Sequence, residues 1–461
     1  MSVIGGKIGS SGLSTATEVN SNSSRLKIEY QPISELKQNP NNPRSHTPKQ
    51  VRQIARSIEK FGFNVPILID TENVVVAGHG RLDAAELLHL TEIPTVQLRH
   101  LTPEQRTAFM IADNKLTENS TWDKKLLAQQ LKILLDAEID LGVEALGFEM
   151  GEIDILLEGV DAPGESDSGD TMPDSDGLPQ VTRVGDLWQL GRNRIICANS
   201  LERNSYTTLL EKRGAALVFM DPPYNVPIAG HATGLGAIQH RDFGMASGEM
   251  SEGEFTDFLA RAFELAVSYS VLGSLHFVAM DWRHSREVLV ASRHIYSEFK
   301  NLCVWVKDNG GMGSLYRSQH ELVFVFKNGN EPHSNNVQLG RFGRYRTNVW
   351  HYPGMNSFSR STEEGNLLKL HPTVKPVALV ADAIMDCSKR GDIVFDPFLG
   401  SGTTVIAAER TGRLCYGMEI DPVYIDTTIR RWQKFTGLSA RHAISGSSFE
   451  ELEREATVGT N

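Results

Sequence analysis

Residues 392–421, DIVFDPFLGSGTTVIAAERTGRLCYGMEID, hold a complete strand–turn–helix–strand pattern. The run at 393–395 is β-prone and apolar, the segment 404–410 is typical of a helix start, and a second strand is predicted over 414–418. Such units recur in sheets of parallel strands that have helices on both faces. We therefore expect an α/β fold with a Rossmann-like, doubly wound domain in this half of the chain.

Three residues of this unit predict a nucleoside site. Gly400 and Gly402 form a tight turn that lets a ligand approach the backbone, and Glu419 ends the second strand, where an acid can receive ribose hydroxyls. A plain turn of any α/β protein is the alternative. The third glycine of a dinucleotide fingerprint is missing, and no Gly-Lys-Ser/Thr follows to make a phosphate loop.

A second stretch, LVFMDPPYNV (217–226), raises a chemical question. Its first four residues predict a strand that is buried on both faces. The strand ends at Asp221, Pro222, Pro223 and Tyr224. A proline turn that caps a strand would explain the prolines, but it does not explain an acid and a tyrosine beside them.

The order of these two stretches carries a family resemblance. DPPY followed later by FDPFLGSGTT resembles the β class of amino-methylating DNA methyltransferases, in which the catalytic half precedes the half that binds S-adenosylmethionine. HPTVKP (371–376) and WVKDNGGMGSLYRSQHELVFVF (305–326) resemble further blocks of that class, and the similarity spans about 181–437. The resemblance implies S-adenosylmethionine as cofactor and double-stranded DNA as partner.

The resemblance assigns catalysis to the DPPY residues. An adenine amino nitrogen is a poor nucleophile because its lone pair is delocalised into the ring. The Asp221 carboxylate and the Pro222 carbonyl would accept its two N–H bonds, and Pro222 and Pro223 would hold the backbone in place. Tyr224 would stack on the flipped base, a contact that contributes about 1–3 kcal/mol in single-strand binders.

The resemblance also assigns the cofactor residues. Asp396, Phe398, Gly400 and Gly402 match the glycine-turn motif, and Glu419 matches the ribose acid. Two further positions belong to this prediction. Lys375 would lie near the cofactor's carboxylate, with a solvated lysine as the alternative, and Asn199 in IICANSLE (195–202) replaces the acid that commonly holds the cofactor's adenine.

DNA contacts are expected from segments that precede the HPTVKP block. Target recognition is expected at about 328–370, where RFGRYR (341–346) interleaves arginines with aromatic residues, and a loop over the base pocket is expected at 225–251. A solvated loop is the alternative for RFGRYR. The predicted DNA-binding residues are Arg317, Arg341, Arg344 and Arg346.

The N-terminal part resembles the ParB/sulfiredoxin-like fold over residues 31–98. Its GHGR turn (Gly78, His79, Gly80, Arg81) lies between a β-prone run and a helix predicted over 82–90, where relatives bind nucleotide phosphates. Sulfiredoxins have a cysteine in this turn, and partition proteins have paired arginines. This chain has neither, so a structural or DNA-contacting role stays open beside nucleotide binding.

Composition sets the boundaries between these parts. The net charge is −11, but the fourteen acids between Leu135 and Gln180 account for it, so the remainder is mildly basic and DNA is not excluded. The expected domains are a disordered 1–24, a ParB-like α+β domain at 25–115, a helical extension at 116–158, an acidic disordered linker at 159–180, the methyltransferase at 181–440 and a tail at 441–461.

Other features exclude some classes of protein. No apolar run approaches the roughly 18 residues of a membrane span, and the N-terminus lacks a secretory signal. Four separated cysteines show no metal-ligand spacing, which favours reduced thiols in a cytoplasmic protein. We predict no metal and no membrane contact, and we leave a homodimer open.

The predicted activity is methyl transfer from S-adenosylmethionine to adenine N6 in duplex DNA. Methylation of cytosine N4 is an alternative within the class, although it goes more often with serine in place of Asp221. A nucleotide-switched ParB-like DNA-binding protein with a degenerate methylase half is the alternative from another class. RNA or protein methylation is a third, and those relatives usually carry Asn at the first position of the motif.

Overall fold

The computed structural model describes residues 26–137, 143–158, 168–173, 177–225, 248–308, 310, 315–341, 343–354 and 374–459. The chain divides into two compact units. The first comprises residues 1–127 and 133–148, and the second comprises 128–132 and 149–461. The division passes through α4 (Lys124–Asp136). The predicted N-terminal disorder at 1–24, and all but the ends of the predicted loop at 225–251, lie outside the described residues.

The first unit is a small α+β fold around a four-stranded sheet with the order β1-β4-β2-β3. Its elements are β1 (Ile28–Pro32), η1 (Ile33–Glu35), α1 (Pro48–Phe61), β2 (Ile67–Ile69), β3 (Val75–Ala77), α2 (His79–Leu87), β4 (Glu92–Gln97), α3 (Pro103–Glu118) and η2 (Val143–Leu146). One face of the sheet packs Ile67, Ile69 and Val75 against Leu82 of α2. On the other face, Val76 and Val96 lie with Met110 of α3.

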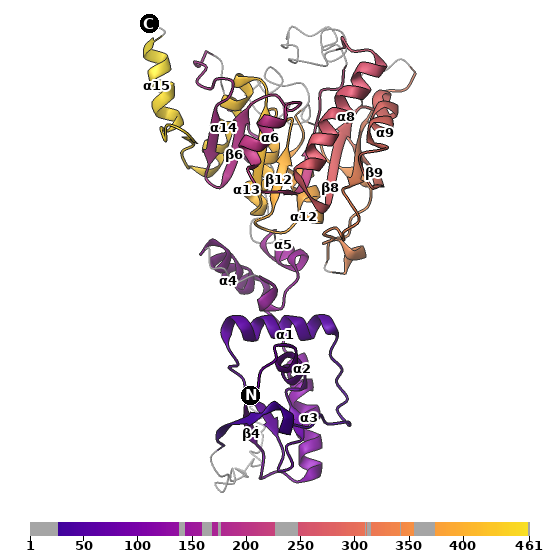
Figure 1. Ribbon diagram of the computed structural model, residues 1–461, viewed down its shortest axis with the longest axis vertical. Coiled ribbons are helices and arrows are strands. Elements are labelled where there is room, and N and C mark those ends of the chain that lie inside the picture. The colour runs from indigo at the N-terminus through magenta and orange to yellow at the C-terminus, as the bar shows by residue number, and fades with distance from the viewer. Residues whose placement is uncertain are drawn as a thin grey trace, which may run out of the picture. The chain divides into compact units, whose positions relative to one another are not determined.

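The second unit is built on a ten-stranded sheet with the order β11-β9-β10-β8-β7-β12-β13-β6-β5-β14 (Figure 1). Its strands are β5 (Leu187–Leu190), β6 (Asn193–Cys197), β7 (Ala215–Met220), β8 (Ser270–Met280), β9 (Glu298–Val306), β10 (His320–Lys327), β11 (Val349–His351), β12 (Ile393–Asp396), β13 (Leu414–Glu419) and β14 (Arg441–His442). The five strands from β8 to β6 are parallel, and β10 is inserted antiparallel between β8 and β9.

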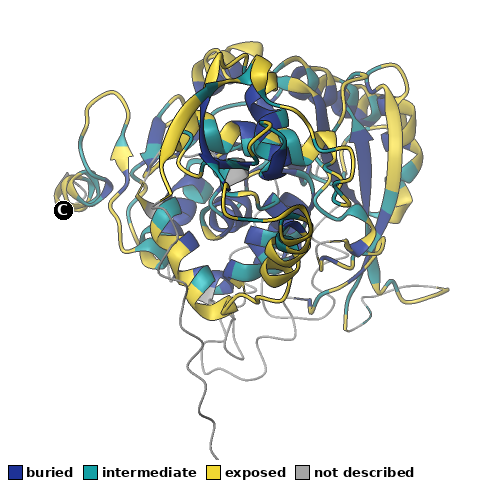
Figure 2. Cartoon of the chain, turned by 90° about the horizontal axis from the view of Figure 1, so that it is seen from below, coloured by how far each residue is buried: buried dark blue, intermediate teal, exposed yellow. Residues whose placement is uncertain are grey.

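Helices cover both faces of this sheet. One hydrophobic cluster joins the sheet to α12 (Val377–Cys387), α13 (Thr403–Thr411) and α14 (Pro422–Thr436). The other cluster joins the opposite face to α6 (Arg203–Leu210), α8 (Glu252–Ser268) and α9 (Ser285–Ser292). The central strands are therefore buried on both sides (Figure 2), as the continuous apolar run at 217–220 predicted. The α/β, doubly wound prediction is confirmed.

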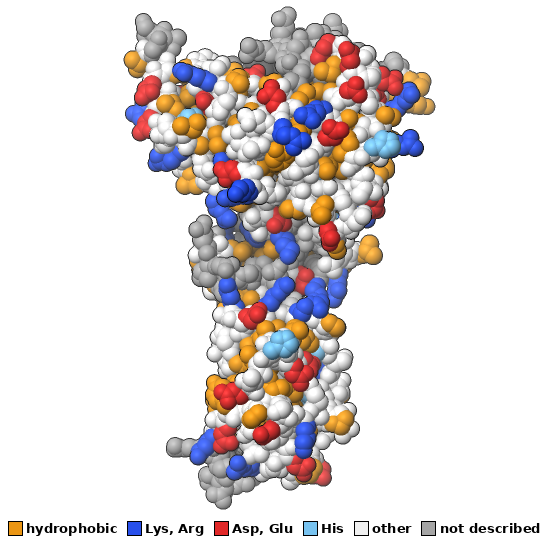
Figure 3. Space-filling view, viewed as in Figure 1, with side chains coloured by type: hydrophobic (Ala, Val, Ile, Leu, Met, Phe, Trp, Pro, Cys, Tyr) orange, Lys and Arg blue, Asp and Glu red, His pale blue; other side chains and the backbone are white. Residues whose placement is uncertain are grey.

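The remaining elements of the second unit are α5 (Met150–Glu158), η3 (Ser168–Asp170), η4 (Trp282–His284), η5 (Gln338–Gly340) and α15 (Phe449–Gly459). Among the described helices, none combines the length and apolar character that a membrane span requires. On the face shown in Figure 3, basic and acidic side chains alternate over the second unit without a large area of one sign.

The segment before the predicted methyltransferase domain is more ordered than its composition suggested. In α5, Asp154 is buried and its carboxylate accepts hydrogen bonds from Arg413 at 2.8 and 2.9 Å. In η3, the Gly169 carbonyl accepts from Arg431 (2.8 Å), and Asp170 accepts from the backbone N–H of Val377 at the start of α12 (2.9 Å).

The prediction of a continuous disordered linker at 159–180 is therefore wrong for residues 168–173. Arg431 binds the backbone carbonyl of Gly169, and the carboxylate of Asp170 accepts from the N-terminus of α12. Composition alone could not show these partners, because they lie more than two hundred residues away along the chain.

Candidate active site

Four predicted site residues lie at one edge of the large sheet. Because β7, β12, β13 and β6 are parallel neighbours, their carboxyl ends meet at the same edge. Asp221 follows β7, Asp396 ends β12, Glu419 ends β13, and Asn199 comes two residues after β6. From β12 the sheet continues to β13 and β6, and from β7 it continues to β8 in the other direction. Open α/β sheets bind ligands in the crevice at such a reversal, which here lies between the ends of β7 and β12.

The DPPY turn is held by a buried cation. Lys375 Nζ donates to Asp221 Oδ2 (2.6 Å) and to the Tyr224 hydroxyl (3.0 Å), and it lies 3.1 Å from Glu321 Oε2. The Tyr224 hydroxyl lies 2.7 Å from Asp221 Oδ1 and 3.0 Å from Glu321 Oε2. The Lys375 side chain is only 4 % exposed, whereas that of Asp221 keeps 21 %. Asp221 is therefore more exposed than Lys375 and than Glu321, whose side chain is 10 % exposed.

The electrostatics of this group follow from burial and pairing. Burial raises the pKa of Asp221, and the Lys375 ammonium opposes that rise. Burial alone would lower the pKa of Lys375, but the two carboxylates raise it above its usual value. Burial would also raise the pKa of Glu321, yet Lys375 and Lys307 together lower it to about 2. The group therefore pairs two acidic side chains with two lysines.

The position of Lys375 corrects one prediction. We expected this lysine to lie beside the carboxylate of a cofactor, but its ammonium contacts Asp221, Tyr224 and Glu321. A buried ammonium needs anionic partners, and the DPPY turn supplies one of them. His371, Pro372 and Thr373 of the HPTVKP block lie outside the described residues.

Asn225, directly after DPPY, forms three hydrogen bonds with residues 248 and 250. It adopts a left-handed conformation (φ +50°), which asparagine tolerates better than most residues. Its side-chain oxygen accepts from the backbone N–H groups of Gly248 (3.1 Å) and Met250 (3.2 Å), and its Nδ2 donates to the Met250 carbonyl (2.8 Å). These bonds hold Gly248 and Met250 beside Asn225, the residue that follows Tyr224.

The glycine turn is tied to the strand ends by two acids. Asp396 accepts from the Phe398 N–H (3.0 Å) and from the Thr404 hydroxyl (2.6 Å), and burial raises its pKa to about 7. Glu419 accepts from the N–H of Gly400 (2.9 Å) and of Asp421 (2.9 Å). Burial raises the Glu419 pKa, while these backbone bonds oppose the rise. Asp396 thus binds residues on both sides of the glycine turn, and Glu419 binds the turn from the neighbouring strand.

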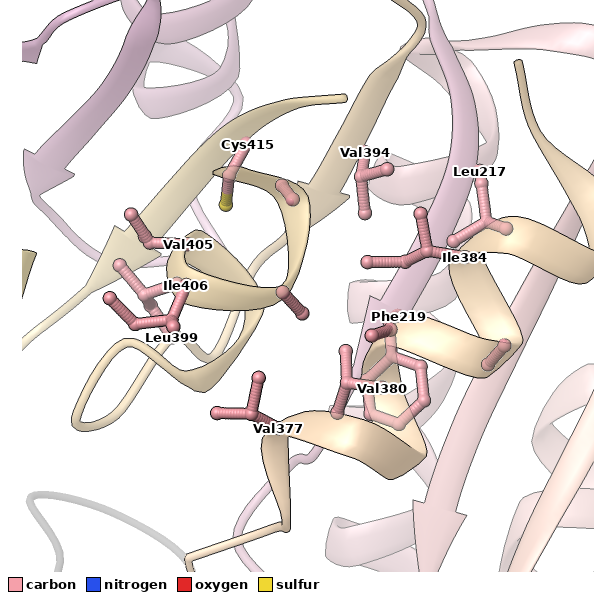
Figure 4. Packing of buried hydrophobic residues seen from close by; sticks show 14 of the residues in the cluster. Leu217, Phe219, Val377, Val380, Ile384, Val394, Leu399, Val405, Ile406 and Cys415 are labelled. Carbon is pink, nitrogen blue, oxygen red and sulfur yellow. The ribbon is translucent and has the colours of Figure 1, made fainter. Parts of the chain in front are cut away.

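Backbone conformation and close packing explain why glycines occupy this turn. Gly400 and Gly402 both have positive φ, at +54° and +84°. A Cβ on Gly402 would lie 2.6 Å from the Thr428 side chain, so helix packing against α14 excludes one there. Leu399 and the first residues of α13 point into the core beside Val377 and Val380 of α12 (Figure 4). The turn is therefore held by the core on one side.

Asn199 follows a contact between the ends of β6 and β13. The N–H of Ala198 donates to the Glu419 carbonyl (2.9 Å), which joins the two strand ends. The Asn199 side-chain oxygen accepts from the Leu201 N–H (2.9 Å). This bond fixes the orientation of the side-chain amide.

Two of the four predicted DNA-binding arginines, Arg344 and Arg346, pair with acids of α12. Arg344 is buried and its guanidinium bonds to Asp386 (2.8 Å) and Asp382 (3.0 Å), so we withdraw it as a DNA contact. Arg346 pairs with the same two acids at 3.0 and 3.1 Å but remains partly exposed. Arg317 and Arg341 are exposed. The alternation in RFGRYR predicted DNA contacts, but α12 supplies two acids that the pattern could not reveal.

The GHGR turn of the first unit forms the first turn of α2 rather than a loop before it. Gly78 is left-handed (φ +104°), and its carbonyl accepts from the N–H groups of Arg81 and Leu82. His79 is buried, and burial lowers its pKa. Within the described part of the chain, the buried His79 Nε2 and Arg81 Nε atoms have no hydrogen-bond partner.

Sequence reasoning did not assign Glu321 and Lys307 to the site. Glu321 is the second residue of the strand HELVFVFK, where an acid directly precedes an apolar run in the same way as Asp221 directly follows one. That placement was a usable signal. Lys307 donates to Glu321 Oε1 and lies 4.6 Å from the centre of the Trp305 ring, and nothing in its local sequence distinguishes it from a surface lysine.

Comparisons with known proteins find relatives of both parts of the chain. The DNA methylase family matches residues 215–430, and the ParB N-terminal domain matches residues 17–115. The ParB-like nuclease domain-containing protein YnaK of Escherichia coli is 44% identical over 84 residues, which are 18% of this chain and 97% of that protein. The DNA adenine methyltransferase YhdJ of E. coli is 32% identical over 159 residues, 32% of this chain and 50% of YhdJ.

A solved structure, the M1.HpyAVI–SAM complex, is 18% identical and has a TM-score of 0.36. The alignment covers 51% of this chain and 98% of that one.

Proposed function

We propose that this chain, which belongs to the ParB-like proteins through its N-terminal domain and carries a DNA methylase domain behind it, methylates the N6 amino group of adenine in duplex DNA. The observation that carries the proposal is the position of Asp221. Its carboxylate stands at the crevice of the sheet, is partly exposed, and is oriented by Tyr224 and Lys375. YhdJ, an adenine methyltransferase, supports the choice of base.

The residues at the strand ends fit S-adenosylmethionine as cofactor. Each Glu419 oxygen accepts one backbone N–H and keeps a lone-pair direction for a ribose hydroxyl. Asn199 would hold an edge of the cofactor's adenine, and the turn from Asp396 through Phe398 to Gly402 would lie along its chain. When bound, S-adenosylmethionine supplies a methyl group on a positively charged sulfur. We no longer assign Lys375 to this group, because Asp221 and Glu321 engage it.

The chain's own residues prepare the target amine. Asp221 and the Pro222 carbonyl accept its two N–H bonds and so draw the nitrogen lone pair out of conjugation with the ring. Pro222 and Pro223 restrict the backbone that presents these acceptors. Tyr224 provides a ring face for the flipped base, which returns part of the few kcal/mol that flipping costs. The backbone of the turn holds both acceptors in position before the reaction.

Duplex DNA is the proposed partner, and its phosphates would be met by exposed basic residues. Arg317 and Arg341 are exposed, Arg346 is partly exposed, and Tyr345 presents 83% of its surface beside them. Such contacts make binding weaken as salt rises. We keep cytosine N4 as the runner-up for the base, and we keep the cytoplasm as the compartment, where four free thiols are stable.

The test is to incubate the protein with methyl-labelled S-adenosylmethionine and unmethylated plasmid DNA, then to digest the DNA and separate its nucleosides. We expect label in N6-methyladenine with the wild-type protein and none with Asp221→Ala. Label in N4-methylcytosine would select the runner-up. Absence of label from DNA would contradict the proposed function.

A second candidate function concerns the first unit, where the buried and unpartnered His79 Nε2 and Arg81 Nε lie at the N-terminus of α2. These atoms support an anion site for a nucleotide phosphate. Titration of the protein with the four ribonucleoside triphosphates by calorimetry tests this site. We expect binding of at least one, lost in Arg81→Ala, with Arg99→Ala on the exposed end of the sheet as control. Equal heats of nucleotide binding for Arg81→Ala and Arg99→Ala would contradict an anion site at Arg81.

A further inference from the structure

Glu321 faces the catalytic turn from a different element. It lies at the start of β10, paired in register with Trp305 of β9, whereas Asp221 and Tyr224 follow β7 and Lys375 precedes α12. Its side chain is 10% exposed, about half of the exposed fraction of Asp221. Glu321 therefore belongs to the wall of the site, and Asp221 to its opening.

Asp221 and Glu321 share two hydrogen-bond donors, the Lys375 ammonium and the Tyr224 hydroxyl. The three N–H bonds of Lys375 match Asp221 Oδ2, the Tyr224 hydroxyl and Glu321 Oε2 at 2.6, 3.0 and 3.1 Å. The Tyr224 hydroxyl has one proton but lies within hydrogen-bond distance of both Asp221 and Glu321. Glu321 thus competes with Asp221 for the same ammonium and the same hydroxyl proton.

This competition matters because a substrate amine needs the oxygens that Lys375 and Tyr224 engage. An Asp221 carboxylate bound tightly by an ammonium is a weaker acceptor for an amino group. An alternative carboxylate next to the same cation lowers the cost of releasing Asp221. We propose that Glu321 is a positioning residue, which takes a larger share of Lys375 and of the Tyr224 hydroxyl when the target amine binds to Asp221. This inference rests on the proposed function and adds a residue to its site.

Lys307 makes Glu321 suitable for this role. It donates to Glu321 Oε1, the oxygen that faces away from Lys375 and Tyr224, and it lies over the Trp305 ring. Glu321 therefore stays ionised and fixed, while its other oxygen, Oε2, is available to both shared groups. The exchange needs only a shift of hydrogen bonds within the group and no change in its total charge.

A residue that only stabilises the fold would behave differently on titration. Asp221 is faced by Lys375, Tyr224 and Glu321, with Lys307 behind Glu321 and Asp396 at the neighbouring strand end. Removing the negative charge of Glu321 leaves Lys375 to act on Asp221 alone, which lowers the pKa of Asp221. Removing the positive charge of Lys307 has the opposite sign, because Glu321 then binds Lys375 more strongly and Asp221 less so.

The test compares Glu321→Gln, Glu321→Asp and Lys307→Met with the wild type, using labelled S-adenosylmethionine and unmethylated plasmid DNA. The control is Glu298→Gln, the same change at an exposed carboxylate of β9 that pairs with Lys300 (3.0 Å). For each protein we measure kcat, KM for DNA, the dissociation constant of the cofactor and the pH dependence of kcat/KM. Thermal unfolding shows that the variants are folded.

For Glu321→Gln we expect kcat to fall about 10- to 100-fold, the effect of a small misplacement at a reacting centre, with cofactor affinity unchanged. The acid limb of kcat/KM should move about one pH unit lower, as for loss of a neighbouring like charge. Glu321→Asp should restore part of the rate and the wild-type limb. Lys307→Met should move the limb upward, and Glu298→Gln should match the wild type.

A Glu321→Gln variant with wild-type kcat would overturn the inference, and so would a reduced kcat with an unmoved acid limb. If Glu321→Gln does not fold, the direction of the limb in Lys307→Met decides, because a downward or absent shift contradicts the charge argument. A wild-type protein that labels no DNA would fail the proposed function itself. If the wild type methylates DNA and the variants match it, only the proposed role of Glu321 is contradicted.

Discussion

Lys375 Nζ lies 2.6 Å from Asp221 Oδ2, although 154 residues separate the two in the chain. The contact joins the loop before α12 to the turn after β7 and places a buried positive charge beside the acid that we expect to meet the substrate. It also ties the segment before the glycine turn to the catalytic turn rather than to the cofactor alone.

Asp221→Ala should abolish methyl transfer and leave cofactor affinity close to that of the wild type. The variant removes the acceptor for the target amine, and loss of one preorganised hydrogen-bonding group costs about 10²–10³ in kcat. Single-turnover transfer and cofactor titration measure the two quantities. Retained turnover would remove Asp221 from the mechanism.

Lys375→Met should reduce transfer strongly while cofactor affinity changes little. Methionine fills a similar volume without the ammonium, so Asp221, Tyr224 and Glu321 lose their shared donor. The same change at the exposed Lys212 serves as the control. A large loss of cofactor affinity in Lys375→Met would instead restore the cofactor-carboxylate contact that we have corrected.

Glu419→Ala should weaken cofactor binding before it affects anything else. The carboxylate accepts from Gly400 and Asp421, and the ribose hydroxyls would occupy its remaining lone pairs. Charge-assisted hydrogen bonds contribute about 1.5–3 kcal/mol, so we expect a roughly 10- to 100-fold rise in the dissociation constant. Calorimetric titration with S-adenosylmethionine measures it, and an unchanged constant would exclude Glu419 from the ribose site.

Asp396→Asn should change how stability depends on pH. Burial raises the pKa of Asp396 to about 7, above the value of an unfolded aspartate near 3.9. The folded state therefore binds more protons between these values, and this residue lowers stability as pH rises from about 4 to about 7. Urea unfolding at several pH values should show that the free energy of unfolding of the variant rises relative to that of the wild type as pH increases over this range. Asp257→Asn, on the exposed side of α8, should show no such trend.

A fragment that begins at Glu149 should be more stable than one that begins at Leu178. The shorter fragment lacks Asp154 and Asp170, so Arg413 loses its buried carboxylate and the start of α12 loses its acceptor. Removing one partner of a buried ion pair costs about 3–5 kcal/mol. Chemical denaturation of both fragments measures the difference. Equal midpoints would restore the boundary near 180 that composition suggested.

Local patterns in the sequence were sufficient for the central architecture. The apolar runs at 217–220 and 393–395, the glycine turn and the helix after it have the expected order and type, because each depends on neighbours within a few residues. The acids at the ends of these strands were predictable for the same reason. Parallel strands bring their carboxyl ends to one edge, so Asp221, Asp396 and Glu419 had to converge.

Only the tertiary structure decided what each charged residue contacts. Lys375 was expected beside a cofactor, Arg344 beside DNA, and the acids near 170 in a disordered linker. Lys375 is instead buried against Asp221 and Glu321, and Arg344 against Asp382 and Asp386. Asp170 accepts from the N-terminus of α12, and Arg431 binds the neighbouring Gly169 carbonyl. A charge taken out of water must be paired, and its partner is chosen by proximity in the folded chain rather than along the sequence.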